Sequence, residues 1–471
     1  MARVARTLWL LAMLACSDAV PREPLSVAEL LDPQSCKDCH PRHYAEWSGS
    51  MHAYAMRDPV FQAMNRRGQE ETGGELRDFC LKCHAPLALR EEAIDDFADL
   101  TDVPEHLQGV TCYFCHNVAS VEKPHNNASL TLAGDNRMRG ALKNPVEPYA
   151  HRVEYSKFLD PGKLDSSLMC GSCHDIQMPN GFHIERTLEE YQGSVFAQDN
   201  GFQSCSSCHT RFKERREPAA DYDLAQVPAR VVHEHTWPGV DVALDEFPNS
   251  AAQRVLIERC MFGVRTTFVA NAETLGRNPS EYFAFKVFLE STNVGHNVPS
   301  GASQDRRLWL EVHAFEGDRE VFVSGAIADD QLEQDSQLFL FRDRLLDEHG
   351  EETHMFWRAS QRAPDSTTLV TTTPANALSP LGHGAEYRYV TGVTKPPARL
   401  ELKLRMRPMG RDVLEDLVDS GHLDPAVMER MPTFTVAEWQ GEFDAKTGTY
   451  LLSPTSEATC EEYERLMNPE D

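Results

Sequence analysis

The sequence reads Cys36-Lys37-Asp38-Cys39-His40 near its start, and this CxxCH pattern returns four more times before residue 210. The later copies are Cys80–His84, Cys112–His116, Cys170–His174 and Cys205–His209. Together the copies use ten of the thirteen cysteines in the 471-residue chain. A histidine fixed at the same place in five copies indicates one chemistry used five times.

That chemistry is covalent attachment of haem. Two cysteines three positions apart can each form a thioether to a haem vinyl group, and the next histidine is then held at the iron. Structural zinc sites use CxxC pairs without requiring that histidine, and a disulfide scaffold predicts neither the histidine nor the tight spacing. The sequence therefore predicts five haems c. The thioether residues are Cys36, Cys39, Cys80, Cys83, Cys112, Cys115, Cys170, Cys173, Cys205 and Cys208, and the proximal iron ligands are His40, His84, His116, His174 and His209.

A haem that only transfers electrons is usually six-coordinate, so each iron needs a second ligand from the protein. The preferred candidates lie in haem-rich sequence or beside turn residues that hold a side chain rigidly; they are His52, His151, His183, His235 and His296. Further candidates are His43, His106, His125, His233, Met51 and Met56. For any one of these histidines, a surface position is the more common role. For His313, His349, His354, His383 and His422, solvent exposure or structural hydrogen bonding is preferred.

Several stretches around the motifs resemble the cytochrome c-554-like multihaem cytochromes, which are related to the haem arrays of hydroxylamine oxidoreductase and pentahaem nitrite reductase. The resemblance is carried by Trp47 to Phe61, Gly109-Val110-Thr111, Cys170 to Asp175, and the segment from Glu190-Tyr191 to Cys205. It implies haems packed in close pairs, with distal ligands that are mostly histidines from elsewhere in the chain. On this basis His52, His151 and His235 are favoured over His183 and His296.

The departures from these relatives limit what the resemblance implies about activity. No CxxCK motif is present, although that motif attaches the catalytic haem in a typical pentahaem nitrite reductase. Reduction of nitrite to ammonia is therefore disfavoured. The chain also has fewer haem motifs than hydroxylamine oxidoreductase, and nothing in it identifies the tyrosine crosslink of that enzyme. A shared haem scaffold does not imply a shared reaction.

The character of the sequence changes after about residue 250. Residues 20–250 combine turns with short helices, one of which is predicted from Asp58-Pro59 to Arg67. Strands are predicted at Tyr282–Glu290, Leu308–His313, Val321–Ser324 and, with strict alternation, Leu400–Arg407; helices are predicted at Arg411–Ser420 and from Asp424-Pro425. We expect an α+β chain, with a mainly α or irregular multihaem domain at 20–250 and a β-sandwich-like domain at 251–471 that carries short C-terminal helices.

The first residues of the chain and the cysteines outside the motifs predict where the protein works. Arg3 and Arg6 precede a short apolar run, which predicts a signal peptide over residues 1–19 and export to the periplasm or cell envelope. Cys16 follows a degenerate lipobox, so an outer-membrane lipoprotein with a lipid anchor is one expectation and cleavage after Ala19 is the other. Cys260 and Cys460 remain for a disulfide, at even odds.

The formal net charge of −27 disfavours nucleic acid and favours a redox partner with a basic docking patch, although solubility alone explains it equally well. Two functions remain open. The favoured one is electron transfer through five six-coordinate haems to or from this partner. The alternative is a multihaem oxidoreductase acting on a small nitrogen or sulfur compound at one haem whose distal position is open.

Overall fold

The computed structural model describes residues 23–199, 201–210, 215–221, 227–265, 268–275, 282–326, 332–365, 367–375, 384–455 and 459–467. The predicted signal segment, Cys16 and His383 lie outside these residues. Among the described residues, no helix is long and apolar enough to cross a membrane.

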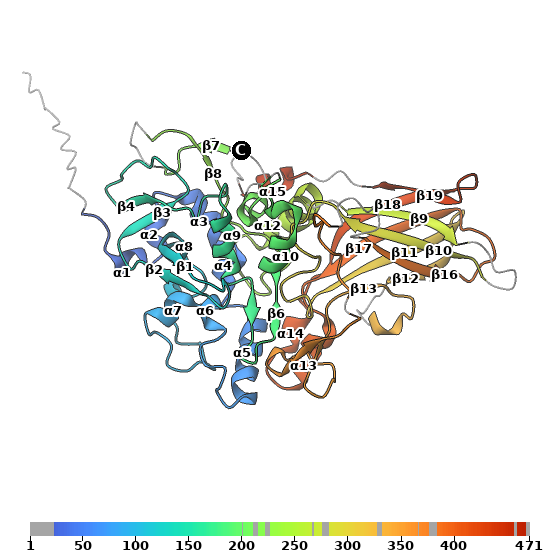
Figure 1. Cartoon of the computed structure of the whole chain (residues 1–471), viewed down its shortest axis with the longest axis horizontal. Coiled ribbons are helices and arrows are strands. Elements are labelled where there is room, and N and C mark those ends of the chain that lie inside the picture. Colours follow the sequence, from blue (N-terminus) through green and yellow to red (C-terminus); the bar gives the residue numbers. More distant parts are fainter. Residues whose placement is uncertain are drawn as a thin grey trace, which may run out of the picture.

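The first half of the chain consists of short helices and two-stranded ribbons, as Figure 1 shows in blue and green. The helices are α1 (Val27–Leu30), α2 (Gln34–Lys37), α3 (Pro41–Ser48), α4 (Met51–Tyr54), α5 (Pro59–Glu71), α6 (Leu81–His84), α7 (Pro86–Arg90), α8 (Cys112–His116), α9 (Leu164–Gly171), α10 (Thr187–Gly193) and α11 (Cys205–His209), with 3₁₀ turns η1 (Glu105–Leu107) and η2 (Val195–Ala197). The ribbons pair β1 (Val118–Val121) with β2 (Leu130–Leu132), β3 (Arg137–Gly140) with β4 (Arg152–Tyr155), β5 (Ile176–Gln177) with β6 (His183–Glu185), and β7 (Arg215–Glu217) with β8 (Arg230–Val232).

The helix predicted at Asp58-Pro59 is confirmed, and it extends to Glu71. The Asp58 side chain caps it by accepting a hydrogen bond from the backbone N–H of Val60, and proline at the first helical position fits the cap. The helix after the first motif, α3, does not run on to His52. It ends at Gly49, and Ser50 caps the separate helix α4. A Cβ atom at Gly49 would lie 2.8 Å from Asn249 Cβ, so this break allows a close approach of two segments.

A nine-stranded sheet dominates the second half of the chain (Figure 1). Its order is β12 (Arg319–Ser324), β11 (Arg307–Glu316), β17 (Arg399–Arg407), β18 (Phe434–Asp444), β19 (Thr449–Pro454), β9 (Phe268–Leu275), β10 (Ala284–Ser291) and β16 (Ala385–Val390), and β13 (Leu340–Phe341) also pairs with β11. All neighbours in this sheet are antiparallel. The strand predicted from alternation is confirmed, because Leu400, Leu402, Leu404 and Met406 on β17 are at most 1% exposed.

The sheet is a single curled layer rather than the two separate sheets of a standard sandwich. Phe322 on β12 lies 6.1 Å from Phe285 on β10 and 5.9 Å from Tyr389 on β16, measured between ring centres. Strands at opposite ends of the pairing order therefore face each other across one core. The α+β class is confirmed, and the sandwich-like packing comes from twist and curling that the strand patterns alone do not reveal.

The remaining helices connect the two halves. They are α12 (Ser250–Val255), the π-helical segment η3 (Leu256–Arg265), the 3₁₀ turns η4 (Leu332–Gln334) and η5 (Phe356–Arg358), α13 (Arg411–Asp419), α14 (Pro425–Met428) and α15 (Glu461–Met467), beside a small ribbon of β14 (Leu345–Leu346) and β15 (Gln361–Arg362). Val60 and Met64 on α5 share a hydrophobic cluster with Val413 and Leu417 on α13. The division into domains at residue 250 stays a prediction, since this cluster spans it.

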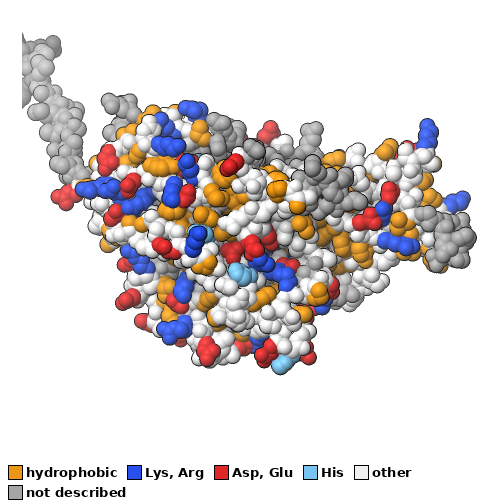
Figure 2. Space-filling view, in the orientation of Figure 1, with side chains coloured by type: hydrophobic (Ala, Val, Ile, Leu, Met, Phe, Trp, Pro, Cys, Tyr) orange, Lys and Arg blue, Asp and Glu red, His pale blue; other side chains and the backbone are white. Residues whose placement is uncertain are grey.

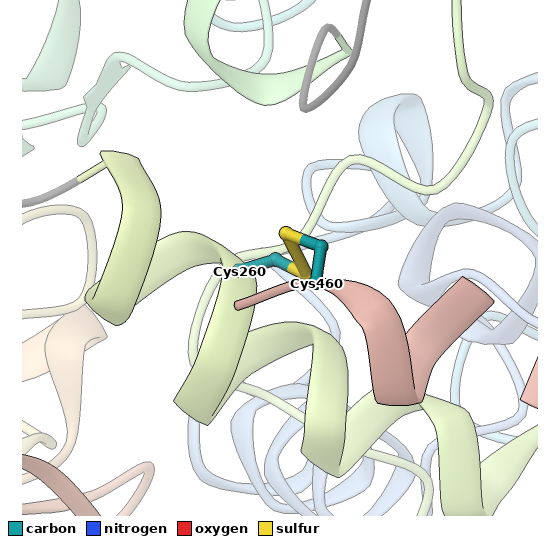
Figure 3. The surroundings of a disulfide bond; sticks show 2 residues. All are labelled: Cys260 and Cys460. Carbon is teal, nitrogen blue, oxygen red and sulfur yellow. A yellow bond between two sulfur atoms is a disulfide. The ribbon is translucent and has the colours of Figure 1, made fainter. Parts of the chain in front are cut away.

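A disulfide closes the last connection. Cys260 on η3 bonds to Cys460, which immediately precedes α15, across 200 residues of sequence and a Cα–Cα distance of 5.1 Å (Figure 3). The sequence left this disulfide open, and the structure pairs the two cysteines. The bond holds α15 against α12, where Tyr463 packs on Ala252 and Leu256.

Candidate haem sites

Each CxxCH motif forms one helical turn. In the first, second and fourth motifs the histidine N–H donates to the carbonyl of the first cysteine, at 2.8 Å in His40, 3.1 Å in His84 and 3.0 Å in His174. Residues three and four apart lie on the same side of such a turn. Both thiols and the imidazole are thus presented together, as attachment of one haem requires. We number the sites 1 to 5 after the motifs in chain order.

Four of the motif histidines face a second histidine at a shared spacing. Ring centres lie 6.3 Å apart at site 1 (His40 and His151), 6.2 Å at site 3 (His116 and His235), 6.2 Å at site 4 (His174 and His52) and 6.3 Å at site 5 (His209 and His296). An imidazole nitrogen binds a first-row metal at about 2.0–2.1 Å, so two imidazoles on opposite sides of one iron have ring centres roughly 6 Å apart. The observed gaps fit an iron between the rings.

Backbone carbonyls orient most of these imidazoles through Nδ1. The Nδ1 atoms of His40, His84, His116 and His209 hydrogen-bond to the carbonyls of Ala219, Ala55, Arg139 and Pro238, and those of His151, His235 and His296 to the carbonyls of Arg152, His233 and Asn297. A carbonyl oxygen can only accept a hydrogen bond, so each of these Nδ1 atoms carries the proton and Nε2 is left free to bind a metal. Within the described part of the chain, neither His52 nor His174 has such an acceptor.

Burial keeps the imidazoles neutral. Desolvation lowers the pKa of His52 to about 3, and that of His174 and His209 to about 4. Neighbouring histidines account for a smaller part of each of these decreases in pKa. Neutral imidazole is the form that binds a metal, so these groups need no deprotonation at neutral pH.

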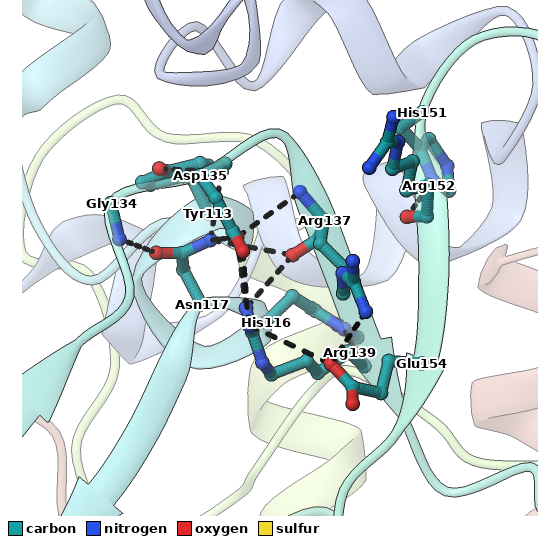
Figure 4. Close-up of polar contacts among 10 residues, drawn as sticks. All are labelled: Tyr113, His116, Asn117, Gly134, Asp135, Arg137, Arg139, His151, Arg152 and Glu154. Carbon is teal, nitrogen blue, oxygen red and sulfur yellow. Dashed lines mark hydrogen bonds and ion pairs between the residues drawn. The ribbon is translucent and has the colours of Figure 1, made fainter.

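The scaffold around site 3 shows how a motif is fixed (Figure 4). Asn117, the residue after the third motif, is fully buried, donates to the carbonyls of Asp135 and Arg137, and accepts from the Gly134 N–H at 2.7 Å. The same loop continues into β3, where the Arg139 carbonyl meets His116. β4 pairs in parallel with β3 and starts next to His151, so one ribbon supports sites 1 and 3.

Site 2 differs from the other four. The ring of His84 stacks face to face on Phe61, with centres 3.9 Å apart and planes 6° from parallel. An imidazole binds a metal ion at a ring nitrogen, in the plane of the ring. The Phe61 ring lies on the face of His84, so it supports the imidazole and does not lie opposite it across an iron. Among the described residues, no second histidine lies opposite His84 at the spacing of the other sites.

His183, a predicted distal residue, is not placed opposite any motif histidine. It lies on β6, where its Nδ1 is 3.6 Å from the Asp175 carboxylate. The structure thus brings together four of the five preferred candidates. Of the other candidates, His43 lies on the helix that follows the first motif, with its ring centre 6.0 Å from that of His40 and 4.6 Å from that of His235. The C-terminal His313 is engaged by Glu311 and Glu320, as its preferred structural role predicts.

Contacts between motif cysteines show which sites are neighbours. The thiol of Cys36 lies close enough to that of Cys112 for each to shift the pKa of the other, and the same holds for Cys83 with Cys173 and for Cys170 with Cys205. Cys115 also interacts electrostatically with Cys173. Site 4 is therefore adjacent to sites 2, 3 and 5, and site 1 is adjacent to site 3. Sequence reasoning left this order open.

Comparisons with known proteins bear on the family and the fold. Residues 35–117 match the family model described as "Cytochrome c554 and c-prime". A solved structure, the "Crystal structure of a penta-heme cytochrome c552 from Thermochromatium tepidum", matches with a TM-score of 0.58 and 18% sequence identity, over 89% of this chain and 100% of that chain. At this identity the likeness shows a common fold. No curated protein matches the sequence.

The predicted resemblance is thus confirmed by a match that includes the first three motifs. The motif turns, the histidine pairs and the neutral imidazoles all suit covalently bound haem c. The match over residues 35–117 and the shared fold therefore support a multihaem cytochrome c that is similar to the cytochrome c554 family.

Proposed function

We propose that the chain is an exported electron carrier that binds five haems c, one at each CxxCH motif. The observation that carries this proposal is the set of four histidine pairs at 6.2–6.3 Å, each containing one motif histidine. Haem supplies an iron that changes its oxidation state, and the protein controls the potential through ligands, burial and hydrogen bonds. The fifth motif turn, Cys205–His209, has the same form as the others.

The proposed ligand set follows from the pairs. The proximal ligands are His40, His84, His116, His174 and His209, and the distal ligands are His151 at site 1, His235 at site 3, His52 at site 4 and His296 at site 5. Site 5 thus takes its distal ligand from the second half of the chain. Asn297 N–H and the Ser300 hydroxyl both donate to the Glu190 carboxylate, at 3.1 and 2.6 Å, and so hold the His296 loop against the haem sites.

Electrons would cross the protein in the order set by the cysteine contacts. The path runs from site 1 through site 3 to site 4, and sites 2 and 5 both join it at site 4. Site 4 is then the branch point of the array. A holoprotein structure in which the iron of site 4 had only one near neighbour would contradict this order.

A second candidate function rests on site 2. His84 lacks a facing histidine in the described structure and stacks on Phe61 instead, so site 2 is the site that could offer the open distal position a multihaem oxidoreductase needs. In that case the substrate would be a small nitrogen or sulfur compound, with sites 1, 3, 4 and 5 supplying or removing electrons.

Electron paramagnetic resonance of the oxidised protein tests both candidates. Site 2 changes the expectation of five six-coordinate haems: we now expect four low-spin irons and one high-spin iron per chain, and one carbon monoxide bound per five haems after reduction. Five low-spin irons with no carbon monoxide binding would exclude the open site and the oxidoreductase function. Haem content below five, measured as pyridine haemochrome on denatured protein, would contradict the electron carrier as proposed.

We further propose that the protein works outside the cytoplasm with a partner that carries a basic patch. The support is the signal-like N-terminal sequence and the net charge of −27. Acidic and basic side chains alternate on the face drawn in Figure 2. Because the two signs are mixed on this face, the net negative charge would attract a basic partner as a long-range field of the whole protein. Dissolved salt screens such a field. Reduction by a basic redox protein should slow as ionic strength rises, and a rate independent of salt would contradict this partner.

A further inference from the structure

The segment His233–Gly239 contacts three of the haem sites. His235 supplies the ring that faces His116 at site 3, and the Pro238 carbonyl accepts a hydrogen bond from His209 Nδ1 of site 5 at 2.8 Å. Trp237 lies between these two residues. Its indole ring reaches towards site 4, so one short loop connects the residues of sites 3, 4 and 5.

Trp237 contacts two of the imidazoles that we propose as distal ligands. Its ring centre lies 4.9 Å from that of His52 and 5.1 Å from that of His235, with interplanar angles of 55° and 76°. These distances fall in the range of favourable edge-to-face and tilted aromatic contacts. The indole is therefore a direct bridge between site 4 and site 3.

The backbone at Trp237 has a conformation that large side chains avoid. Its φ angle is +40°, in the left-handed region, where the Cβ atom crowds the following peptide. Glycine adopts this region without cost, and strained residues of this kind concentrate at functional sites. The loop keeps a tryptophan here although it is unfavourable for the backbone, which indicates that the indole itself is needed.

Among the proposed distal histidines, His52 is the one whose ring is not oriented by a hydrogen bond to a described residue. The other three proposed distal histidines each donate from Nδ1 to a backbone carbonyl, at 3.1 Å in His151, 3.0 Å in His235 and 2.8 Å in His296. His52 makes no such bond to any described residue. Its orientation must then come from packing, and Trp237 is the ring packed on it.

We infer that Trp237 is a positioning residue that fixes the planes of the His52 and His235 imidazoles and couples site 3 to site 4. This inference rests on the proposed ligand set. The relative orientation of two axial imidazoles controls the g-values of a low-spin ferric haem. Loss of the indole should therefore change the signals of sites 3 and 4 and leave those of sites 1 and 5 in place.

Three variants of the full-length holoprotein test the inference. Trp237→Leu removes the ring and keeps the strained backbone, Trp237→Gly removes both, and Trp237→Phe keeps an aromatic ring. In the Leu and Gly variants we expect two of the four low-spin signals to shift and electron exchange between sites 3 and 4 to slow several-fold. The Phe variant should stay close to the native protein. The Gly variant should unfold at no lower temperature than the Leu variant, because glycine relieves the backbone.

The matched control is Glu92→Gly, which relieves a left-handed residue (φ +53°) at an exposed position without a ring contact. It should leave all four signals unchanged. Native signals in both Trp237→Leu and Trp237→Gly would overturn the inference, and so would shifts at all four sites, which would indicate general loosening. Should the Leu and Gly variants lose haem, the Phe variant decides: native signals at sites 3 and 4 would support the inference, and signals that shift there although a ring is retained would overturn it. Failure of the ligand set itself would already be visible in the native protein, as missing low-spin signals.

Discussion

Replacing both Cys260 and Cys460 with alanine is expected to lower the free energy of unfolding by about 5 kcal/mol. The disulfide closes a loop of 200 residues, and the loss of chain entropy from the unfolded state grows with loop length, to about 5 kcal/mol for a loop of this size. The measurement is urea unfolding of the holoprotein followed by circular dichroism. We also expect α15 to detach first, because Cys460 immediately precedes it and only Tyr463 of the helix is buried.

Two controls test whether the stability comes from the crosslink or from the packing of the two sulfur atoms. Cys260→Ala alone breaks the same bond, so it should destabilise the protein about as much as the double variant. Reducing the native protein should have the same effect without any change of sequence. An unfolding midpoint that is unchanged in the double variant would show that the bond contributes no stability.

The haem sites themselves could be predicted because their signal is local. Within a motif such as Cys112–His116, both thiols and the imidazole lie on one helical turn, so spacing in the sequence determines spacing in the structure. The same holds for β17, where alternation at Leu400, Leu402 and Leu404 fixes the buried face.

The distal residues could be proposed but not paired, because pairing depends on long-range folding. His52 lies 12 residues after His40, yet it faces His174, and the ring opposite His40 belongs to His151. His183 has a similar sequence setting, but β6 places it beside Asp175. No local pattern distinguishes these cases. The role of Trp237 was missed for a related reason, since a left-handed tryptophan between two imidazoles has no signature in the sequence.

Replacing His296 with alanine is expected to convert site 5 from low spin to high spin. The residue faces His209 at 6.3 Å, and its loop belongs to the second half of the chain. Removing the imidazole leaves the iron with one protein ligand, and an open position binds external molecules. Carbon monoxide bound by the reduced protein should therefore rise from one to two per chain, measured by titration at the Soret band. A second high-spin signal should appear in the oxidised protein.

His183→Ala is the matched control, because it also removes one partly buried imidazole, whose Nδ1 lies 3.6 Å from the Asp175 carboxylate and which faces no motif histidine. It should leave both the spin count and the carbon monoxide count unchanged. Added imidazole should restore the low-spin signal in His296→Ala, since the free ligand can occupy the vacated position. If His183→Ala gave the extra high-spin iron and His296→Ala did not, the distal assignment at site 5 would be wrong. The β-rich half would then cover the haem array without supplying a ligand, and the hydrogen bonds from Asn297 and Ser300 to Glu190 would serve docking alone.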